Sequence, residues 1–253
     1  MIFFNLFYIR PFHVLLIALA VQCIAVFLGD TVRRRWRKID ETERKDLATL
    51  LPASLTLLAL IIGFSFSMAS ARYDQRKLLE EDEANAIGTE YVRADLVPAQ
   101  TAQIQELLTK YTALRIQFYQ NANIAELRQI YAETMAVQGQ LWAAAAAPAI
   151  ATPTPVAALV ASGMNDVLNS QSYAQAMYWN RLPPGAWMLL LLVAVFSSFL
   201  FGYSEERNSR WRLLLLPVIV ALPLFLIADM DSPRLGLIHV VPQNLLALQA
   251  SLH

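Results

Sequence analysis

Four apolar blocks alternate with polar segments along the chain, and this alternation is its strongest pattern. The blocks cover residues 12–29, 50–71, 187–203 and 213–230. Each has about the 17–25 residues that an α-helix needs to cross the hydrocarbon core of a bilayer. The pattern therefore predicts an all-α integral membrane protein with four transmembrane helices.

The polar segments complete the predicted domain layout. The longest, residues 72–182, is expected to be a helical extramembrane domain inserted between the second and third transmembrane helices. Apolar residues recur every three or four positions over 101–140, which is typical of amphipathic helix, with a break near Asn121–Asn123. Three prolines after Trp142 predict an irregular connector before a third helix, which begins near Val156. The remaining parts are an N-terminal segment 1–11, basic connectors 30–49 and 204–212, and a C-terminal tail 231–253.

Residues 63–98 are the stretch around which the rest is organised. No proline occurs between Pro52 and Pro98, and the sequence passes from small apolar residues to a dense mixture of both charges. We predict one long helix that leaves the membrane and continues into water. Small residues at four-residue spacing let helices approach closely in lipid, and Gly88 favours a neighbouring helix further along. The candidate packing or assembly residues are Gly63, Ser67, Ala71, Asn85, Gly88, Thr89, Arg93 and Asp95.

Composition narrows the class of function. Mean hydropathy is +0.41, and only 16% of residues are charged, where a soluble domain carries about 25%. Net charge is zero, which argues against nucleic acid as a partner because no basic excess exists to neutralise phosphates. The one cysteine, Cys23, cannot form a disulfide within the chain. No glycine-rich nucleotide loop or HExxH spacing occurs, so we predict no catalytic, cofactor-binding or metal site and no enzyme activity.

The distribution of basic residues predicts an orientation in a cell (inner) membrane. The two short connectors hold ten of the 20 Lys and Arg residues. Because basic residues in short loops stay on the cytoplasmic side, both connectors are expected in the cytoplasm. The large helical domain and both termini would then lie outside.

Three pairs of residues are candidates for an ion path. Phe64 and Phe66 could form a hydrophobic constriction, and Arg72 and Arg76 follow the second apolar block, where interfacial snorkelling is the simpler interpretation. Asp82 and Glu83 could form a charged ring only if several subunits contributed, and a solvated helix with paired charges is the alternative. The candidate pore or vestibule residues are thus Phe64, Phe66, Arg72, Arg76, Asp82 and Glu83.

Two parts of the central stretch resemble a known family. Residues 66–76, FSMASARYDQR, and 82–98, DEANAIGTEYVRADLVP, are similar to the bestrophin-like domain family, formerly a domain of unknown function. The later motifs LNS at 168–170, NRLPPGAW at 180–187 and FGY at 201–203 also resemble it. The resemblance implies a relationship to bestrophins, which are oligomeric anion channels with four membrane helices per subunit. It carries no catalytic residues, and it implies a cytosolic helical domain, opposite to the orientation that the charges favour.

Two hypotheses for function follow. The first is an oligomeric ion channel or related transport protein, with the lipid bilayer, further copies of the same chain and an inorganic ion as partners. The alternative is a membrane-anchored helical sensor, scaffold or accessory subunit without transport activity. It is motivated by the amphipathic region 101–140, whose apolar face requires a partner.

Overall fold

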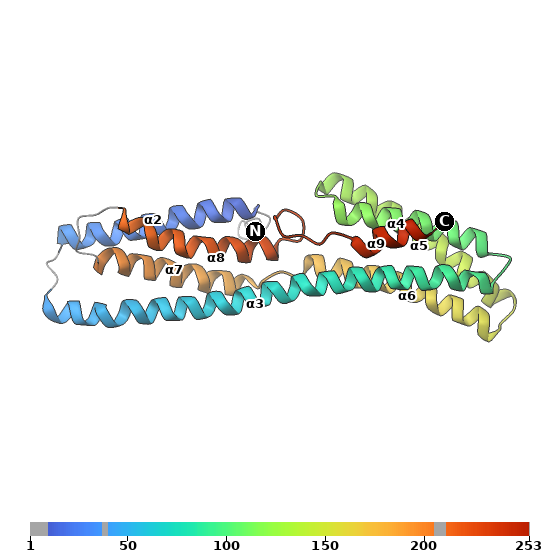
Figure 1. Ribbon diagram of the computed structural model, residues 1–253, viewed down its shortest axis with the longest axis horizontal. Coiled ribbons are helices and arrows are strands. Elements are labelled where there is room, and N and C mark those ends of the chain that lie inside the picture. The colour runs from blue at the N-terminus through green and yellow to red at the C-terminus, as the bar shows by residue number, and fades with distance from the viewer. Residues whose placement is uncertain (1–9, 37–39, 205–210, 253) are drawn as a thin grey trace. The chain divides into compact units, whose positions relative to one another are not determined.

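The structure is a computed structural model, and it describes residues 10–36, 40–204 and 211–252 (Figure 1). The N-terminal segment 1–9, parts of both basic connectors and the last residue of the tail lie outside the described residues. The described chain is helical and contains no strand. It divides into two compact units, one formed by Met1–Ala71 with Arg181–Ile238, the other by Arg72–Asn180 with His239–His253.

The first unit contains the four apolar stretches. They lie in α2 (Pro11–Trp36), the first part of α3 (Glu41–Arg93), α7 (Pro184–Ser204) and α8 (Leu215–Asp231), which follows the short η3 (Arg212–Leu214). Among the described residues, four helices are long and apolar enough to cross a membrane, as predicted. Their small core gathers Ala18, Leu58, Leu190, Ala194, Val220, Ala221 and Leu224.

Two glycines set the distance between α2 and α7. A Cβ atom at Gly202 would clash with the Val26 carbonyl oxygen, and one at Gly29 would clash with that of Phe199. The two backbones therefore touch at this crossing. Close packing of this kind is favoured between helices in lipid, where small residues allow backbones to meet.

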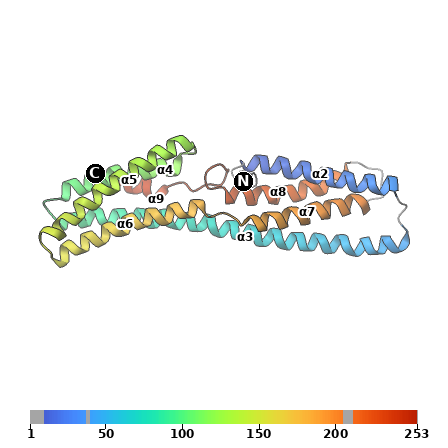
Figure 2. The ribbon, with the colours of Figure 1, turned by 180° about the vertical axis from the view of Figure 1, so that it is seen from behind.

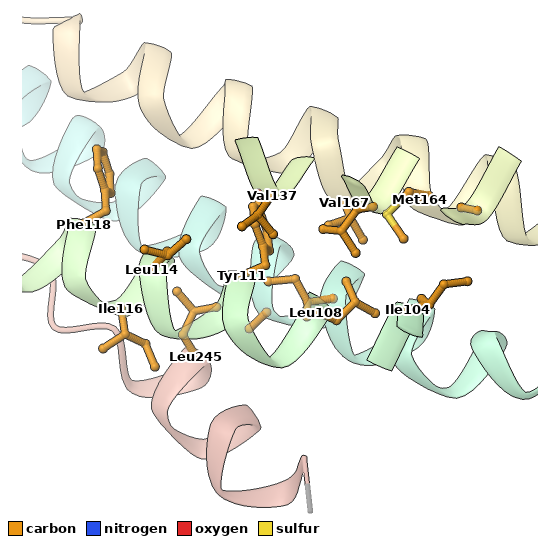
Figure 3. Packing of buried hydrophobic residues seen from close by; sticks show 14 of the residues in the cluster. Ile104, Leu108, Tyr111, Leu114, Ile116, Phe118, Val137, Met164, Val167 and Leu245 are labelled. Carbon is orange, nitrogen blue, oxygen red and sulfur yellow. The ribbon is translucent and has the colours of Figure 1, made fainter. Parts of the chain in front are cut away.

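The second unit is a helical bundle on the other part of α3. After η2 (Ala94–Leu96) come α4 (Thr101–Gln120), α5 (Ile124–Ala151), α6 (Pro155–Trp179) and the C-terminal α9 (Gln243–Ser251), as Figure 2 shows from behind. α4 supplies more of the core than any other helix, and the core also receives Val137 from α5, Met164 and Val167 from α6, and Leu245 from α9 (Figure 3).

A local signal explains where α4 ends and α5 begins. α4 and α5 separate at Asn121–Asn123, where a break was predicted. The Asn123 side chain caps α5 by accepting a hydrogen bond of 3.0 Å from Ala125 N. The predicted connector after Trp142 was wrong, because α5 continues through Pro148 to Ala151. Pro148 lies in the last turn of an alanine-rich helix, so the hydrogen bond that its missing N–H removes is near the helix end, and the alanines before it favour helix.

Candidate functional site

The second half of α3 turns its ionisable residues inward. Buried positions recur every three or four residues, as expected for one helix face. They are Arg76, Glu80, Glu83, Ala84, Ile87 and Glu90. The sequence favoured a solvated helix with charges paired on its surface, but four of these six buried side chains are ionisable. Each must find compensation inside the protein, because an isolated buried charge is costly.

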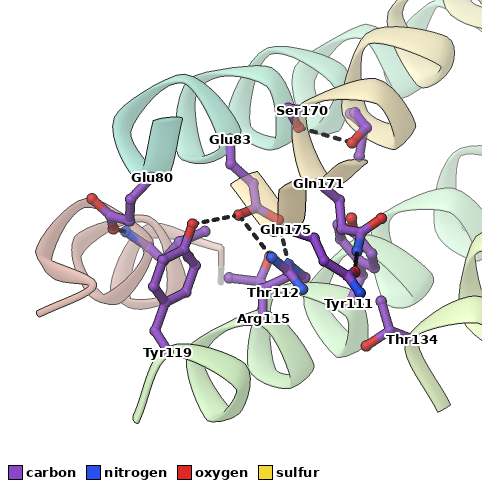
Figure 4. A network of polar contacts seen from close by, with 12 residues as sticks. Glu80, Glu83, Tyr111, Thr112, Arg115, Tyr119, Thr134, Ser170, Gln171 and Gln175 are labelled. Carbon is purple, nitrogen blue, oxygen red and sulfur yellow. Dashed lines mark hydrogen bonds and ion pairs between the residues drawn. The ribbon is translucent and has the colours of Figure 1, made fainter. Parts of the chain in front are cut away.

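Glu83 finds that compensation on α4. Its carboxylate forms an ion pair with Arg115, whose Nε and Nη2 both donate to it, the second at 3.3 Å (Figure 4). Tyr119 Oη donates a third hydrogen bond, of 3.0 Å, to Glu83 Oε2. The Arg115 guanidinium also lies 4.3 Å from the centre of the Phe118 ring. Arg115 is thus held by charge and by an aromatic face at once.

The electrostatics of this cluster follow from its burial. Burial raises the pKa of Tyr119 far above its ordinary value, and the neighbouring Glu83 carboxylate raises it further. Burial alone would lower the pKa of Arg115, but the negative charge of Glu83 more than offsets it, so the pKa is raised. Tyr119 and Arg115 therefore both keep their protons at physiological pH.

Polar side chains extend the cluster toward α5 and α6. Gln138 Nε2 donates to Tyr111 Oη and to Gln171 Oε1, both at 3.3 Å, and Gln171 Nε2 donates to Gln175. Tyr111 has its pKa raised by burial and by the charge of Glu83. These hydrogen bonds link α4, α5 and α6 inside the core, which favours one packing over alternatives.

Glu80 binds the beginning of the C-terminal helix. Its Oε1 accepts a hydrogen bond of 2.9 Å from Leu245 N, and its Oε2 accepts one of 2.7 Å from Asn244 Nδ2. A carboxylate at this position satisfies N–H groups that have no partner inside α9 and complements the helix dipole. About two turns further along α3 and one turn further along α9, a Cβ atom at Gly88 would lie 3.1 Å from Leu248 Cδ1. Glu80 and Gly88 together seat α9 on α3.

Glu90 is the buried acid on this face of α3 that lacks a hydrogen bond. Its side chain is completely buried, yet neither carboxylate oxygen has a hydrogen-bond partner. The Arg93 Nη1 atom lies 4.0 Å away, and Gly163 of α6 faces the carboxylate with no room for a Cβ atom. Glu90 belongs to the second unit and lies well beyond residues 50–71, the block predicted to cross the membrane. Burial raises the pKa of Glu90 from 4.5 to about 7; Arg93 opposes the shift, and Asp166 adds to it.

The predicted pore or vestibule residues divide between the two faces of α3. Phe64 is 63% exposed and shares its face with Asp82, which is also exposed. Phe66 lies about 200° around the helix from Phe64, so the two rings cannot line one path together. Arg76 is buried and its Nε donates to Met177 O at 3.5 Å. Glu83 is buried against Arg115, which leaves Asp82 as the accessible acid of that pair, while Arg72 is half-buried.

The predicted packing or assembly residues lie mostly on the exposed side. A Cβ at Gly63 would meet no heavy atom within 4 Å. The others on this side are Ser67, Ala71, Asn85, Thr89 and Asp95. Asp95 also accepts a hydrogen bond of 3.1 Å from Gln105 Nε2. Within the chain, helix packing involves Gly88 and Arg93, and the assembly role of the exposed set stays a prediction.

Some features of the first unit carried no clear sequence signal. Gln22 is buried and accepts a hydrogen bond of 3.3 Å from Ser198 Oγ, which joins α2 to α7 inside the apolar unit. Gly29 and Gly202 mark the same crossing, but they stand at the ends of apolar blocks, where glycine also suits a helix end. Among the described residues, no three His, Cys, Asp or Glu side chains gather into a metal-binding group.

An all-helical fold with four apolar helices of this kind defines a multi-pass membrane protein. The chain belongs to the bestrophin-like family, since a sequence model of the bestrophin-like domain matches residues 14–245. This confirms the resemblance noted in the sequence. No curated protein matches the chain in sequence.

Solved structures with a similar fold are crystal structures of a bacterial bestrophin homologue from Klebsiella pneumoniae. A variant with an aspartate-to-alanine substitution has a TM-score of 0.65 at 12% identity, covering 95% of this chain and 97% of that chain. A variant with a tryptophan-to-alanine substitution has a TM-score of 0.64 at 12% identity, covering 94% of this chain and 93% of that chain. The structure that was phased with zinc has a TM-score of 0.62 at 13% identity, covering 94% of this chain and 98% of that chain. At these identities the likeness establishes the fold.

Proposed function

We propose that the protein is one subunit of an oligomeric ion channel, in which the outward face of α3 lines the ion path. The observation that supports it is the division of α3 into two faces. The inward face carries Glu80, Glu83 and Glu90, and the outward face carries Phe64 and Asp82. Membership of the bestrophin-like family supports the same proposal. In a homo-oligomer, each subunit would contribute the outward face of its α3 to a common central axis.

The outward face needs a partner in the second unit as well. Leu78 is 58% exposed and Val92 is 67% exposed, with the polar Asn85 and Thr89 between them on the same face. Exposed apolar side chains along one helix face indicate contact with another protein surface. Further copies of the chain would cover this face without requiring a second kind of protein.

The proposal includes a layout in the membrane. The four apolar stretches cross the bilayer, and residues 72–182 form a helical extramembrane domain between the second and third crossings. The ten basic residues of the two connectors favour a cytoplasmic location for both connectors and an outer location for the helical domain. The protein has no catalytic role in this scheme. Cysteine labelling of intact spheroplasts tests the orientation, with Glu133→Cys in a Cys23→Ala background, and protection of that cysteine would reverse it.

Ion flux from purified protein tests the function. The full chain in liposomes or planar bilayers is expected to conduct, and Asp82→Cys in a Cys23→Ala background is expected to become sensitive to a charged thiol reagent. Glu133→Cys on α5 is the control, because it is exposed but lies away from the α3 face. A purified protein that stays electrically silent across ions and pH would refute the channel proposal.

One observation favours the second candidate, a membrane-anchored scaffold or accessory subunit. α5 exposes an apolar stripe at helical spacing, formed by Ile124, Tyr131, Met135 and Trp142. Such a stripe is suited to a partner helix. Gentle purification distinguishes the two candidates, since a homo-oligomer favours the channel and a foreign protein at fixed stoichiometry favours the scaffold.

A further inference from the structure

Glu90 combines complete burial with a lack of hydrogen-bond donors. Both carboxylate oxygens are without a partner, and the Arg93 Nη1 atom at 4.0 Å is beyond hydrogen-bond distance. Every other buried acid on the inward face of α3 has donors, since Glu80 accepts two hydrogen bonds and Glu83 accepts three. Glu90 alone lacks a hydrogen-bond donor, and the only favourable charge recorded near it is that of Arg93 at 4.0 Å.

The neighbouring helix is shaped to this carboxyl group. Gly163 of α6 faces both Glu90 Oε2 and the Arg93 guanidinium, and a Cβ atom there would collide with them. Any larger residue would hold α6 away from α3 or push the carboxyl group out. The position thus accommodates a carboxyl group in close contact with a helix backbone, with no group at hydrogen-bond distance to receive its charge.

We propose that Glu90 is a proton-binding site, and that the proton it carries determines how closely α6 packs on α3 at Gly163. With the proton bound, the neutral acid fits the buried position. When the proton leaves to water, the carboxylate requires donors. Arg93 must then move within hydrogen-bond distance or water must enter, and either change loosens the α3–α6 contact.

The charged groups around Glu90 predict how its proton affinity can be tuned. Arg93, on α3 itself, favours the carboxylate, whereas Asp166, on α6, disfavours it. The polar side chain that α4 presents nearby is the neutral Gln105, which donates to Tyr91 O at 3.2 Å. Because burial raises the pKa of Glu90 to about 7, the proton would be lost close to neutral pH.

Hydrogen exchange of the purified full chain tests this proposal over about pH 5 to pH 9, a range that brackets the pKa of Glu90. After correction for intrinsic exchange rates, amides of α6 around Gly163 should exchange several-fold faster on the alkaline side of neutrality. Glu90→Gln, which stays neutral, should remove this pH dependence. Glu81→Gln is the matched control, because Glu81 is exposed on the same helix, and it should keep the wild-type profile.

Two charge variants provide a second test that does not require Glu90→Gln to fold. Asp166→Asn should move the midpoint of the exchange profile to lower pH, and Arg93→Gln should move it to higher pH. Infrared spectra should show the carbonyl stretch of a protonated carboxylic acid fading with the same midpoint. Shifts in the same direction, no shift at all, or a pH dependence that persists in Glu90→Gln would overturn the proposal. None of these readouts requires ion conduction, so the outcome is independent of the channel proposal.

Discussion

Arg115 on α4 and Glu83 on α3 form an ion pair from which solvent is excluded, with 1% and 0% of their side-chain surfaces exposed. Tyr119 completes the carboxylate's hydrogen bonds, and the Phe118 ring covers the guanidinium. The pair links a helix from the family signature to α4, the helix that supplies the largest share of the second unit's core. A buried pair of this kind stabilises little relative to apolar residues, but the loss of one partner leaves a charge without compensation.

Replacing Arg115 alone should therefore be strongly destabilising. Arg115→Met is expected to cost about 3–5 kcal/mol of folding free energy and to lower the apparent Tm by roughly 6–20 °C. The double variant Arg115→Met with Glu83→Gln should recover part of this loss, because no charge is left buried. Thermal unfolding in detergent measures both. Glu81→Gln, an exposed neutral change on the same helix, should stay within ~0.5 kcal/mol of wild type.

Tyr119 should make the second unit sensitive to alkali. Its pKa in the folded protein is raised by burial and by Glu83, so the folded state keeps a proton that the unfolded chain loses above about pH 10. The contribution of Tyr119 to the free energy of unfolding is therefore fully present below about pH 10. It is lost as the pH rises above that value. Tyr119→Phe should lose stability less steeply than wild type between about pH 9 and pH 11. Equal slopes would contradict this, and Tyr131→Phe, at an exposed tyrosine, is the control.

Glu80 should determine whether the C-terminal helix stays bound. Glu80→Ala removes the acceptors for Leu245 N and Asn244 Nδ2, and this should cost about 1–3 kcal/mol. The amides of α9 should then exchange faster while those of α5 change little. Hydrogen exchange with mass spectrometry resolves the two segments. Glu81→Ala is the matched control, and equal protection of α9 in both variants would show that the cap is not what holds the helix.

The sequence predicted the features that local signals encode. Four apolar blocks became four apolar helices because a run of such residues has few other stable environments. The break at Asn121–Asn123 was recognised because asparagine caps helices through its own side chain. These features depend on residues within a few positions of one another, so no knowledge of the fold was needed.

The inward charges of α3 could not be predicted in the same way. In the sequence, Glu83 stands in a run of acidic residues that is typical of a helix surface. Its partner Arg115 lies on another helix and comes close to it only in the folded protein. Glu80 is likewise satisfied by Asn244, near the far end of the chain. Helical periodicity does place these acids on one face, but it does not say which face is buried. The buried face can be identified only when the residues that pair with these acids, such as Arg115 and Asn244, are known.

Gly202, where α2 crosses α7, should not tolerate a larger side chain, whereas Gly63 should. At Gly202 a new Cβ atom would meet the Val26 carbonyl, which is backbone and cannot rotate away, so Gly202→Ala must separate the two helices. We expect a loss of at least about 1–3 kcal/mol and a smaller monodisperse fraction on size exclusion in detergent. Gly63→Ala meets no heavy atom within 4 Å, and the better helix propensity of alanine should leave the stability of the subunit unchanged or raise it by up to ~1 kcal/mol. A Gly202→Ala protein that melts at or above the wild-type temperature would show that this crossing is looser than the structure indicates.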